Sequence, residues 1–266
     1  MQVPEGHTIH RQAREHRARL GGSRLAVSSP QGRFADGAAL LDGRELQRAD
    51  AYGKHLLLGF AGDLRLHVHL GLYGTWEFGP APAPPPRGAV RVRLEGNGSF
   101  ADLRGATACE VWTPAEARAL VARLGPDPLR RRPSAERAWQ RLSRSRTAVG
   151  RLLMDQAVVA GVGNVYRAEV LFRAGLSPHR PGVAVSREEF DDLWADLVAL
   201  MRAGLRAGRI VTTRPADRGR RGTPRAEEAH YVYRRTGLPC RVCGTRVATE
   251  VMAGRNLFWC PGCQAA

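Results

Sequence analysis

The chain has 266 residues, of which 43% are hydrophobic, so it can bury a sizeable core and is long enough for more than one domain. No apolar run approaches the roughly 18 residues of a transmembrane helix, and the Arg- and His-rich start lacks the apolar segment of a signal peptide. The formal net charge of +16 predicts a polyanionic partner, most often nucleic acid; an arginine-rich solvated surface is the alternative.

Residues 1–113 have the pattern of a β-rich domain that begins with a helix. Residues 7–20 are expected to be helical and to stop at a glycine pair. Apolar and polar residues alternate over 64–70 and 90–94, which predicts half-buried antiparallel strands. The proline-rich run 80–86 is expected to be a surface loop, because proline cannot donate a hydrogen bond to a neighbouring strand.

Residues 114–228 change to helical patterns. The helical segments expected are 114–124, 134–143, 147–155, 165–174 and 186–204. The last of them begins with a capping box of Ser186 and Glu189 and has one apolar face. The basic segment 214–230 has no apolar period and is expected to be a mobile loop. The remaining residues, 229–266, are predicted to form a small metal-binding module.

Four of the five cysteines form two C-x2-C pairs near the C-terminus: Cys240, Cys243, Cys260 and Cys263. This spacing is typical of a tetrahedral zinc site that substitutes for a core in a short segment. Four protein ligands leave no open position on the metal, so one structural Zn2+ per chain is expected. Two unrelated pairs or a redox pair are the alternative. The fifth cysteine, Cys109, is expected to be a buried thiol.

A glycine-rich turn lies within MDQAVVAGVGNVYRAEVLF, residues 154–172. A helix is expected to end near Gln156, Gly161 and Gly163 allow a tight turn, and Asn164 is expected to cap the next helix. The N–H groups at such a helix start can bind a phosphate. A plain helix hairpin with glycines for packing is the alternative.

Lys54 is the single lysine among 41 basic residues. An ammonium group is a compact point charge that arginine does not replace well, which singles out this position. Compositional drift explains a lone lysine almost equally well.

The motifs PEG, GKHLL, LGLYG, LGPDPL, DQAVVAGVGNVYRAEVLF and FWCPGCQ occur in an order that resembles the formamidopyrimidine-DNA glycosylase/endonuclease VIII family over almost the whole chain. The resemblance implies an α+β multidomain fold, with an N-terminal antiparallel β-sandwich carrying an N-terminal helix, a helix–two-turn–helix domain and a C-terminal zinc-finger hairpin. It also implies a base-excision-repair enzyme that flips an oxidised base out of damaged DNA, removes it and cuts the strand. Such an enzyme is expected in the bacterial cytoplasm, associated with the nucleoid. A monomer is expected because the sequence has no heptad repeat and no obvious apolar patch.

The resemblance assigns the chemistry to the N-terminus. Pro4 matches the proline whose secondary amine attacks C1′ of the flipped nucleotide, leaving a Schiff base from which β- and δ-elimination follow. Glu5 matches the adjacent glutamate that protonates the sugar ring oxygen and shuttles protons. The alternative for Glu5 is a first-turn residue stabilised by the helix dipole.

The same match assigns the DNA contacts. Lys54, Asn164 and Arg255 match groups that contact phosphates around the lesion. Leu72 and Tyr73 match side chains that fill the space left by the flipped base, where apolar and aromatic groups replace lost stacking. Buried strand-end residues are the alternative for these two.

Two further matches bear on the substrate. Glu169 matches an acidic residue near the active site of family members. Residues 100–110, FADLRGATACE, stand where 8-oxoguanine-type members carry paired arginines facing the orphan base. This departure favours oxidised pyrimidines as substrates.

Pro4 cannot react in the chain as written. It is a tertiary amide with a delocalised lone pair, whereas a free α-amine, with a pKa of about 7.7–8.0, is partly neutral at pH 7. We expect that Val3 is encoded by a GTG that serves as the initiation codon, so that the native protein begins Met-Pro4-Glu5 and then loses the methionine. A genuine extension that removes lyase activity and proteolytic trimming are the alternatives. A chain that keeps Gln2 would be a non-cleaving protein that binds lesions or abasic DNA. A zinc-ribbon transcription factor is a third interpretation, which leaves the PEG motif unexplained.

Overall fold

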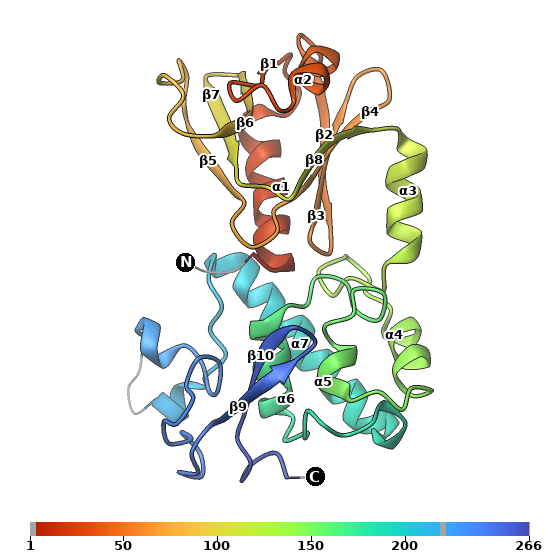
Figure 1. Cartoon of the computed structure of the whole chain (residues 1–266), viewed down its shortest axis with the longest axis vertical. Coiled ribbons are helices and arrows are strands. Elements are labelled where there is room, and N and C mark those ends of the chain that lie inside the picture. The colour runs from red at the N-terminus through yellow and green to blue at the C-terminus, as the bar shows by residue number, and fades with distance from the viewer. Residues whose placement is uncertain (1–3, 219–221, 266) are drawn as a thin grey trace. The chain divides into compact units, whose positions relative to one another are not determined.

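The computed structural model describes residues 4–218 and 222–265, which belong to two compact units, Met1–Arg123 and Leu124–Ala266 (Figure 1). The expected translation start at Val3 lies outside the described residues, as do residues 219–221 within the basic segment 214–230. Over the described ranges, no helix has the length and apolar character needed to span a bilayer.

The first unit contains two antiparallel four-stranded sheets, with strand orders β1-β6-β7-β5 and β2-β3-β4-β8. Its elements are α1 (Gly6–Leu20), β1 (Ala26–Ser28), α2 (Ala35–Leu41), β2 (Leu46–Tyr52), β3 (His55–Phe60), β4 (Leu64–His69), β5 (Thr75–Pro80), β6 (Val90–Gly96), β7 (Ser99–Arg104), β8 (Ala108–Trp112) and α3 (Pro114–Arg123). Helix α1 contacts strands of both sheets and shares one apolar core with them (Figure 1). This arrangement confirms the predicted β-sandwich with an N-terminal helix.

The alternation predicted over 64–70 is present in β4, with one exception. Leu66 and Val68 are fully buried in the core, and Arg65 and His69 are half-buried on the opposite face. His67 also points to that outer face, yet it is buried because the Trp112 ring stacks on it, with ring centroids 3.7 Å apart. The alternating pattern of one strand cannot reveal that His67 is buried, since the Trp112 ring that covers it belongs to another strand.

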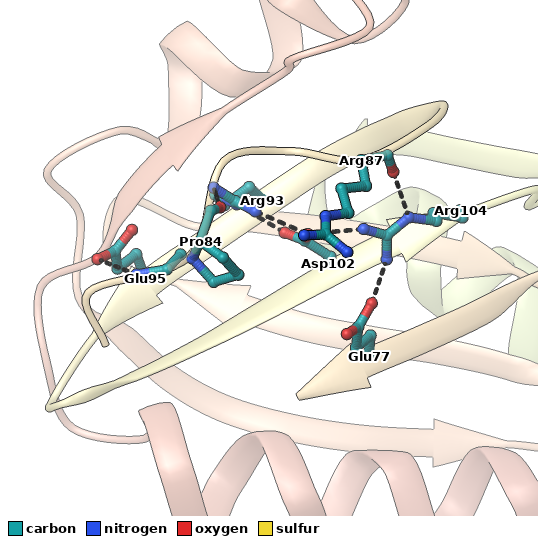
Figure 2. Close-up of polar contacts among 8 residues, drawn as sticks. Glu77, Pro84, Arg87, Arg93, Glu95, Asp102 and Arg104 are labelled. Atoms are coloured by element: carbon teal, nitrogen blue, oxygen red, sulfur yellow. Dashed lines mark hydrogen bonds and ion pairs between the residues drawn. The ribbon is translucent and has the colours of Figure 1, made fainter. Parts of the chain in front are cut away.

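A buried ion pair attaches the proline-rich loop to its sheet (Figure 2). Arg93 on β6 donates two hydrogen bonds to the Asp102 carboxylate on β7, at 2.7 and 2.9 Å, and one to the Pro84 carbonyl at 2.8 Å. Arg104 donates to Asp102 and to the Arg87 carbonyl, both at 3.1 Å. The arginines thus supply donors to loop carbonyls that have no strand partner.

The loop prediction for 80–86 is wrong at its first residue. Pro80 is the last residue of β5 and is paired with Ser99 on β7. Because β5 is an edge strand, the missing N–H of a proline at its end breaks no interior ladder.

The second unit is helical and includes the C-terminal hairpin. Its elements are α4 (Ala135–Leu142), α5 (Val149–Leu152), α6 (Asn164–Arg173), α7 (Arg187–Ala207), the β-hairpin of β9 (Ala248–Met252) and β10 (Arg255–Trp259), and three short 3-10 turns, Gly182–Ala184, Pro215–Arg218 and Ala226–Glu228. Val247, Phe258 and two of the C-terminal cysteines belong to the same apolar core as the helices. The β9–β10 hairpin therefore packs against the helices and shares their apolar core.

Two predicted helix ends are corrected. The helix expected over 147–155 ends at Leu152, and the next backbone N–H groups, those of Met154 and Asp155, donate to carbonyls only three residues earlier, as in turns. Helix α7 continues past the expected end to Ala207, where Gly208 takes the left-handed conformation with φ of 70°. The predicted capping box of α7 is present.

Candidate active site and metal centre

Helix α1 runs antiparallel to β2. The backbone N–H of Gly22, just after the helix, donates to the Leu46 carbonyl at the start of β2, at 2.8 Å. One helical turn earlier, the Arg17 guanidinium donates to the Ala49 carbonyl at 2.9 Å. The start of α1 therefore lies towards the end of β2.

This direction brings Glu5 and Lys54 to the same end of the first unit. The helix rises about 18 Å from Arg17 to Glu5, and the strand advances about 17 Å from Ala49 to Lys54. Figure 1 shows the start of α1 and the turn between β2 and β3 at one end of this unit.

Pro4 and Glu5 immediately precede α1. Pro4 is half-buried, and Glu5 is the N-cap residue, with φ of −120° and ψ of 177°. Its backbone carbonyl accepts the Thr8 N–H at 2.9 Å, but its carboxylate makes no capping hydrogen bond to the helix. The Glu5 side chain is fully buried, although a carboxylate is costly to bury. Helix capping therefore does not account for a glutamate at this position.

Lys54 lies in the two-residue turn of the β2–β3 hairpin, where Tyr52 pairs with His55. Gly53 supplies the positive φ of 57° that this tight turn requires. Because His55 also pairs with His69 at the end of β4, the turn lies beside the segment 70–74 that follows β4.

Leu72 and Tyr73 are exposed in that segment, with 36% and 72% of their surface accessible. The segment forms a turn in which the Gly74 N–H donates to the Leu70 carbonyl at 3.0 Å. Gly71 has a φ of 67°, and a Cβ there would lie 1.9 Å from the Thr107 hydroxyl. The interpretation of Leu72 and Tyr73 as buried strand-end residues is wrong.

Three histidines lie beside the Lys54 turn on β3 and β4. The Nδ1 atom of His55 is 2.9 Å from Nε2 of His67, and the rings of His55 and His69 are 4.9 Å apart. Burial, followed by the charges of His69, His67, Lys54 and Arg123, lowers the pKa of His55 to about 3. Burial, followed by His69, lowers the pKa of His67 to about 4. These two histidines are therefore neutral at pH 7 and add no positive charge beside Lys54.

We expect the free energy of unfolding to decrease as the pH is lowered from 7 to 5. Histidines of the unfolded chain take up protons below their ordinary pKa of about 6.5, whereas folded His55 and His67 remain neutral until about pH 3 to 4. The contribution of these two histidines to the free energy of unfolding is thus fully present above pH 6.5. It is lost as the pH falls towards 3 to 4. Urea unfolding at pH 7, 6 and 5 measures this trend, and a variant with both histidines changed to glutamine should show a smaller slope. A midpoint independent of pH in this interval would contradict the assignment.

In the second unit, Gln156 closes the glycine turn before α6. Its side chain accepts the Gly161 N–H at 2.9 Å and donates to the Val162 carbonyl at 2.9 Å. Gly161 has a φ of 88°, which favours glycine there. The prediction of a helix that ends near Gln156 is therefore wrong. Helix α5 ends at Leu152, and Gln156 lies in a turn that its side chain bridges.

Asn164 is the first residue of α6 and does not cap it, so that prediction is wrong; Gly163 is the N-cap residue. The Asn164 side chain is turned to the C-terminal hairpin, where its Nδ2 donates to the Asn256 carbonyl at 2.9 Å. Its Oδ1 accepts a hydrogen bond from Arg167. These two contacts direct the Asn164 amide towards the hairpin and explain why it does not reach the helix N–H groups.

Arg255 is exposed next to the hairpin turn and pairs with Met252 across it. Ala253 and Gly254 form the turn, with φ of 55° and 67°. Two consecutive positive φ values are typical of a tight hairpin turn. Arg255 and Asn164 thus come from the two segments that the Asn164–Asn256 hydrogen bond joins.

Glu169 is fully buried in α6 and holds the segment that follows the basic loop. Its carboxylate accepts the backbone N–H groups of Tyr231, Val232 and Tyr233, each at 2.8 Å, and the hydroxyl of Thr212. The residue therefore fixes the chain on both sides of 214–230.

The four C-terminal cysteines form the metal centre. All four Sγ atoms lie within 4.8 Å of one another. The Sγ atoms of Cys240 and Cys263 are 3.8 Å apart, and those of Cys243 and Cys260 are 3.4 Å apart. Tetrahedral zinc with bonds of about 2.3 Å to sulfur requires separations of about 3.8 Å, so this set fits Zn2+. The protein has a structural zinc site.

Cys109, by contrast, is buried in the first unit, and burial raises its pKa to about 12.

Sequence reasoning missed Arg167, His67 and Gln156. Arg167 carried a usable signal, since it lies in a helix whose other residues from 165 to 172 are all buried, and an arginine there must have internal partners. The stacked cover of His67 and the amide bridge of Gln156 depend on residues that only the folded chain brings together.

Three family models match the chain in order. They are the formamidopyrimidine-DNA glycosylase N-terminal domain over residues 3–109, the formamidopyrimidine-DNA glycosylase H2TH domain over 124–215, and the zinc finger found in FPG and IleRS over 237–266. The matches cover both units and the metal centre.

Individual proteins give the same result. The chain is 52% identical to Endonuclease 8 1 of Mycobacterium tuberculosis over 98% of this chain and 100% of the relative. It is 33% identical to the formamidopyrimidine-DNA glycosylase of Thermus thermophilus over 85% of each. The crystal structure of MutM (FPG) from that organism matches with a TM-score of 0.79 at 31% identity, over 98% of both chains. A Lactococcus lactis Fpg complex with abasic-site DNA has the same fold, with a TM-score of 0.82 at 20% identity over 98% of this chain and 100% of that one. The chain therefore belongs to the formamidopyrimidine-DNA glycosylase/endonuclease VIII family and is an endonuclease VIII-like member of it.

Proposed function

We propose that this protein is a base-excision-repair DNA glycosylase and abasic-site lyase that removes oxidised bases, preferably pyrimidines, in the bacterial cytoplasm. The observation that carries the proposal is the position of Glu5, which is fully buried next to Pro4 at the end of the first unit that also holds Lys54. The Glu5 carboxyl group, the Pro4 nitrogen and the Lys54 ammonium group are thus at the same end of this unit. Two exposed wedge side chains follow β4 at the same end of that unit.

The reaction begins when a free Pro4 amine attacks C1′ of the flipped nucleotide. The glycosidic bond breaks and the base leaves with its electron pair, taking a proton. As the nitrogen lone pair forms the iminium, the C1′–O4′ bond opens and Glu5 protonates O4′. The iminium acidifies the neighbouring C–H, so that β-elimination breaks the C3′–O bond and δ-elimination breaks the C5′–O bond.

Binding rests on phosphate contacts and on filling the vacated base position. Lys54, Asn164 and Arg255 contact phosphates around the lesion, in keeping with the net charge of +16. Leu72 and Tyr73 enter the stack where the base has left. The protein acts as a monomer on damaged DNA.

The preference for pyrimidines is supported by the short connection between β7 and β8. Strand β7 ends at Arg104 and β8 begins at Ala108, so there is little loop to present paired arginines to an orphan base. The Arg104 side chain is itself engaged, with hydrogen bonds to Asp102 and to Glu77.

We expect single-turnover excision of 5-hydroxyuracil from duplex DNA to be at least about tenfold faster than excision of 8-oxoguanine opposite cytosine, a difference of about 1.4 kcal/mol in transition-state energy. The two duplexes differ in one base, and the enzyme should begin at Pro4. Faster removal of 8-oxoguanine would overturn the proposed preference without affecting the glycosylase assignment.

A second candidate function is supported by the chain as written, in which Pro4 carries an acyl group. That protein would bind lesions or abasic sites without cutting. The two functions differ in covalent trapping and not in binding.

A further inference from the structure

Arg167 is a fully buried arginine in α6, and every residue from Val165 to Phe172 is buried around it. Its Nη1 donates to the Met252 carbonyl at 3.1 Å, and its Nη2 donates to Asn164 Oδ1 and, at 3.4 Å, to the Asn256 carbonyl. Burying a guanidinium group is unfavourable unless hydrogen bonds compensate for its lost hydration. These acceptors lie in two segments, the tip of the C-terminal hairpin and the start of α6. Arg167 therefore joins these two segments.

The first segment is the tip of the C-terminal hairpin. Met252 is the last residue of β9, Asn256 is the second residue of β10, and Arg255 lies between the turn and Asn256. One guanidinium therefore holds a carbonyl on each side of the hairpin turn. Its planar fork has a fixed geometry, which a flexible lysine does not provide. Zinc fixes the opposite end of the hairpin, since Cys260 directly follows β10.

The second segment is the start of α6. With Oδ1 facing Arg167, the Asn164 amide must direct its nitrogen away from the guanidinium, and one N–H reaches the Asn256 carbonyl. An amide nitrogen carries two N–H groups. The second can be donated to a phosphate, and its direction is fixed by the contact with Arg167.

We propose that Arg167 is a positioning residue that holds Asn164 and the Arg255 hairpin in one register, so that both contact the DNA backbone together. This inference rests on the proposed function, in which Asn164 and Arg255 bind phosphates. Arg167 itself is fully buried and acts through these two groups.

The test is a mutant cycle on the full-length, zinc-loaded protein. Binding is measured at low salt to a duplex containing a tetrahydrofuran abasic analogue, which cannot form a Schiff base. Arg167→Met is expected to weaken binding about 30-fold in the otherwise unchanged protein, and less than about threefold when Asn164→Ala and Arg255→Ala are already present. A residue that only stabilises the fold would give the same loss in both backgrounds.

Arg173→Met is the matched control, because Arg173 is a partly buried arginine of the same helix whose hydrogen bonds go to Asp196 and Thr212. Its effect should be the same in both backgrounds. Zinc content and thermal melting are measured for every variant. If Arg167→Met loses zinc, Arg167→Lys replaces it in the cycle, with the same expectation of a loss that disappears in the double-alanine background.

The positioning role of Arg167 and the phosphate contacts of Asn164 and Arg255 are tested by different outcomes. Equal losses from the Arg167 variant in both backgrounds overturn the positioning role while leaving the phosphate contacts intact. Unchanged affinity of the Asn164→Ala/Arg255→Ala protein overturns the phosphate contacts themselves, and with them this part of the proposed function.

Discussion

Replacing Glu5 by glutamine should slow base removal by about 1000-fold, in a chain that begins at Pro4. An amide keeps the size and polarity of the carboxyl group but cannot take up or release a proton at neutral pH. Glu5 is buried and makes no capping bond to α1, so the helix should form equally well in the variant. Single-turnover excision from a lesion duplex gives the rate, and thermal melting checks the fold.

Glu15→Gln is the control for this experiment. Glu15 lies on the same helix, partly exposed, in an ion pair with Arg19. An exposed i,i+4 pair contributes about 0.3–0.5 kcal/mol, and its loss should leave the excision rate unchanged. If Glu5→Gln excises bases at the wild-type rate, Glu5 is not the proton shuttle.

Replacing Cys260 by serine should remove the zinc and weaken binding to damaged DNA about 100-fold. Cys260 is fully buried, and it belongs to the core that packs the hairpin on the helices. Without the metal, the hairpin loses its fixed base, and Arg255 is no longer held beside Asn164. Zinc content and binding to the tetrahydrofuran duplex are the two measurements.

Cys109→Ser is the matched control, because Cys109 is a buried thiol of the first unit and is not among the clustered cysteines. It should keep one zinc per chain and wild-type affinity. A zinc-free Cys260→Ser protein that binds DNA as tightly as the wild type would show that the metal does not position the hairpin for DNA.

The elements with strong periodicity were predictable from the sequence. Residues 186–204 have an apolar face and a capping box, residues 7–20 are followed by a glycine pair, and both segments are helices. The cysteine spacing alone also indicated zinc, since two C-x2-C pairs leave few other uses. These features depend on neighbours within a few residues, which the sequence displays directly.

The remainder depends on contacts between segments distant along the chain. Asn164 looked like a helix cap because local pattern favours that role, yet Asn256 and Arg167 engage its amide. His67 looked exposed because Trp112 is 45 residues away in sequence. The residues of the candidate active site were predicted from resemblance to a family, and the direction of α1 along β2 supplies the physical reason why Glu5 and Lys54 lie at the same end of the first unit.

Borohydride trapping on an abasic-site duplex tests the central claim most directly. Two proteins are compared, the chain as written and one that begins Met-Pro4-Glu5, so that only the second exposes the Pro4 amine after methionine removal. We predict a covalent protein–DNA adduct with the shorter chain alone, because only a free amine forms a reducible Schiff base. Tight binding of both chains without an adduct from either would contradict the lyase mechanism and identify the protein as a non-cleaving binder of abasic DNA.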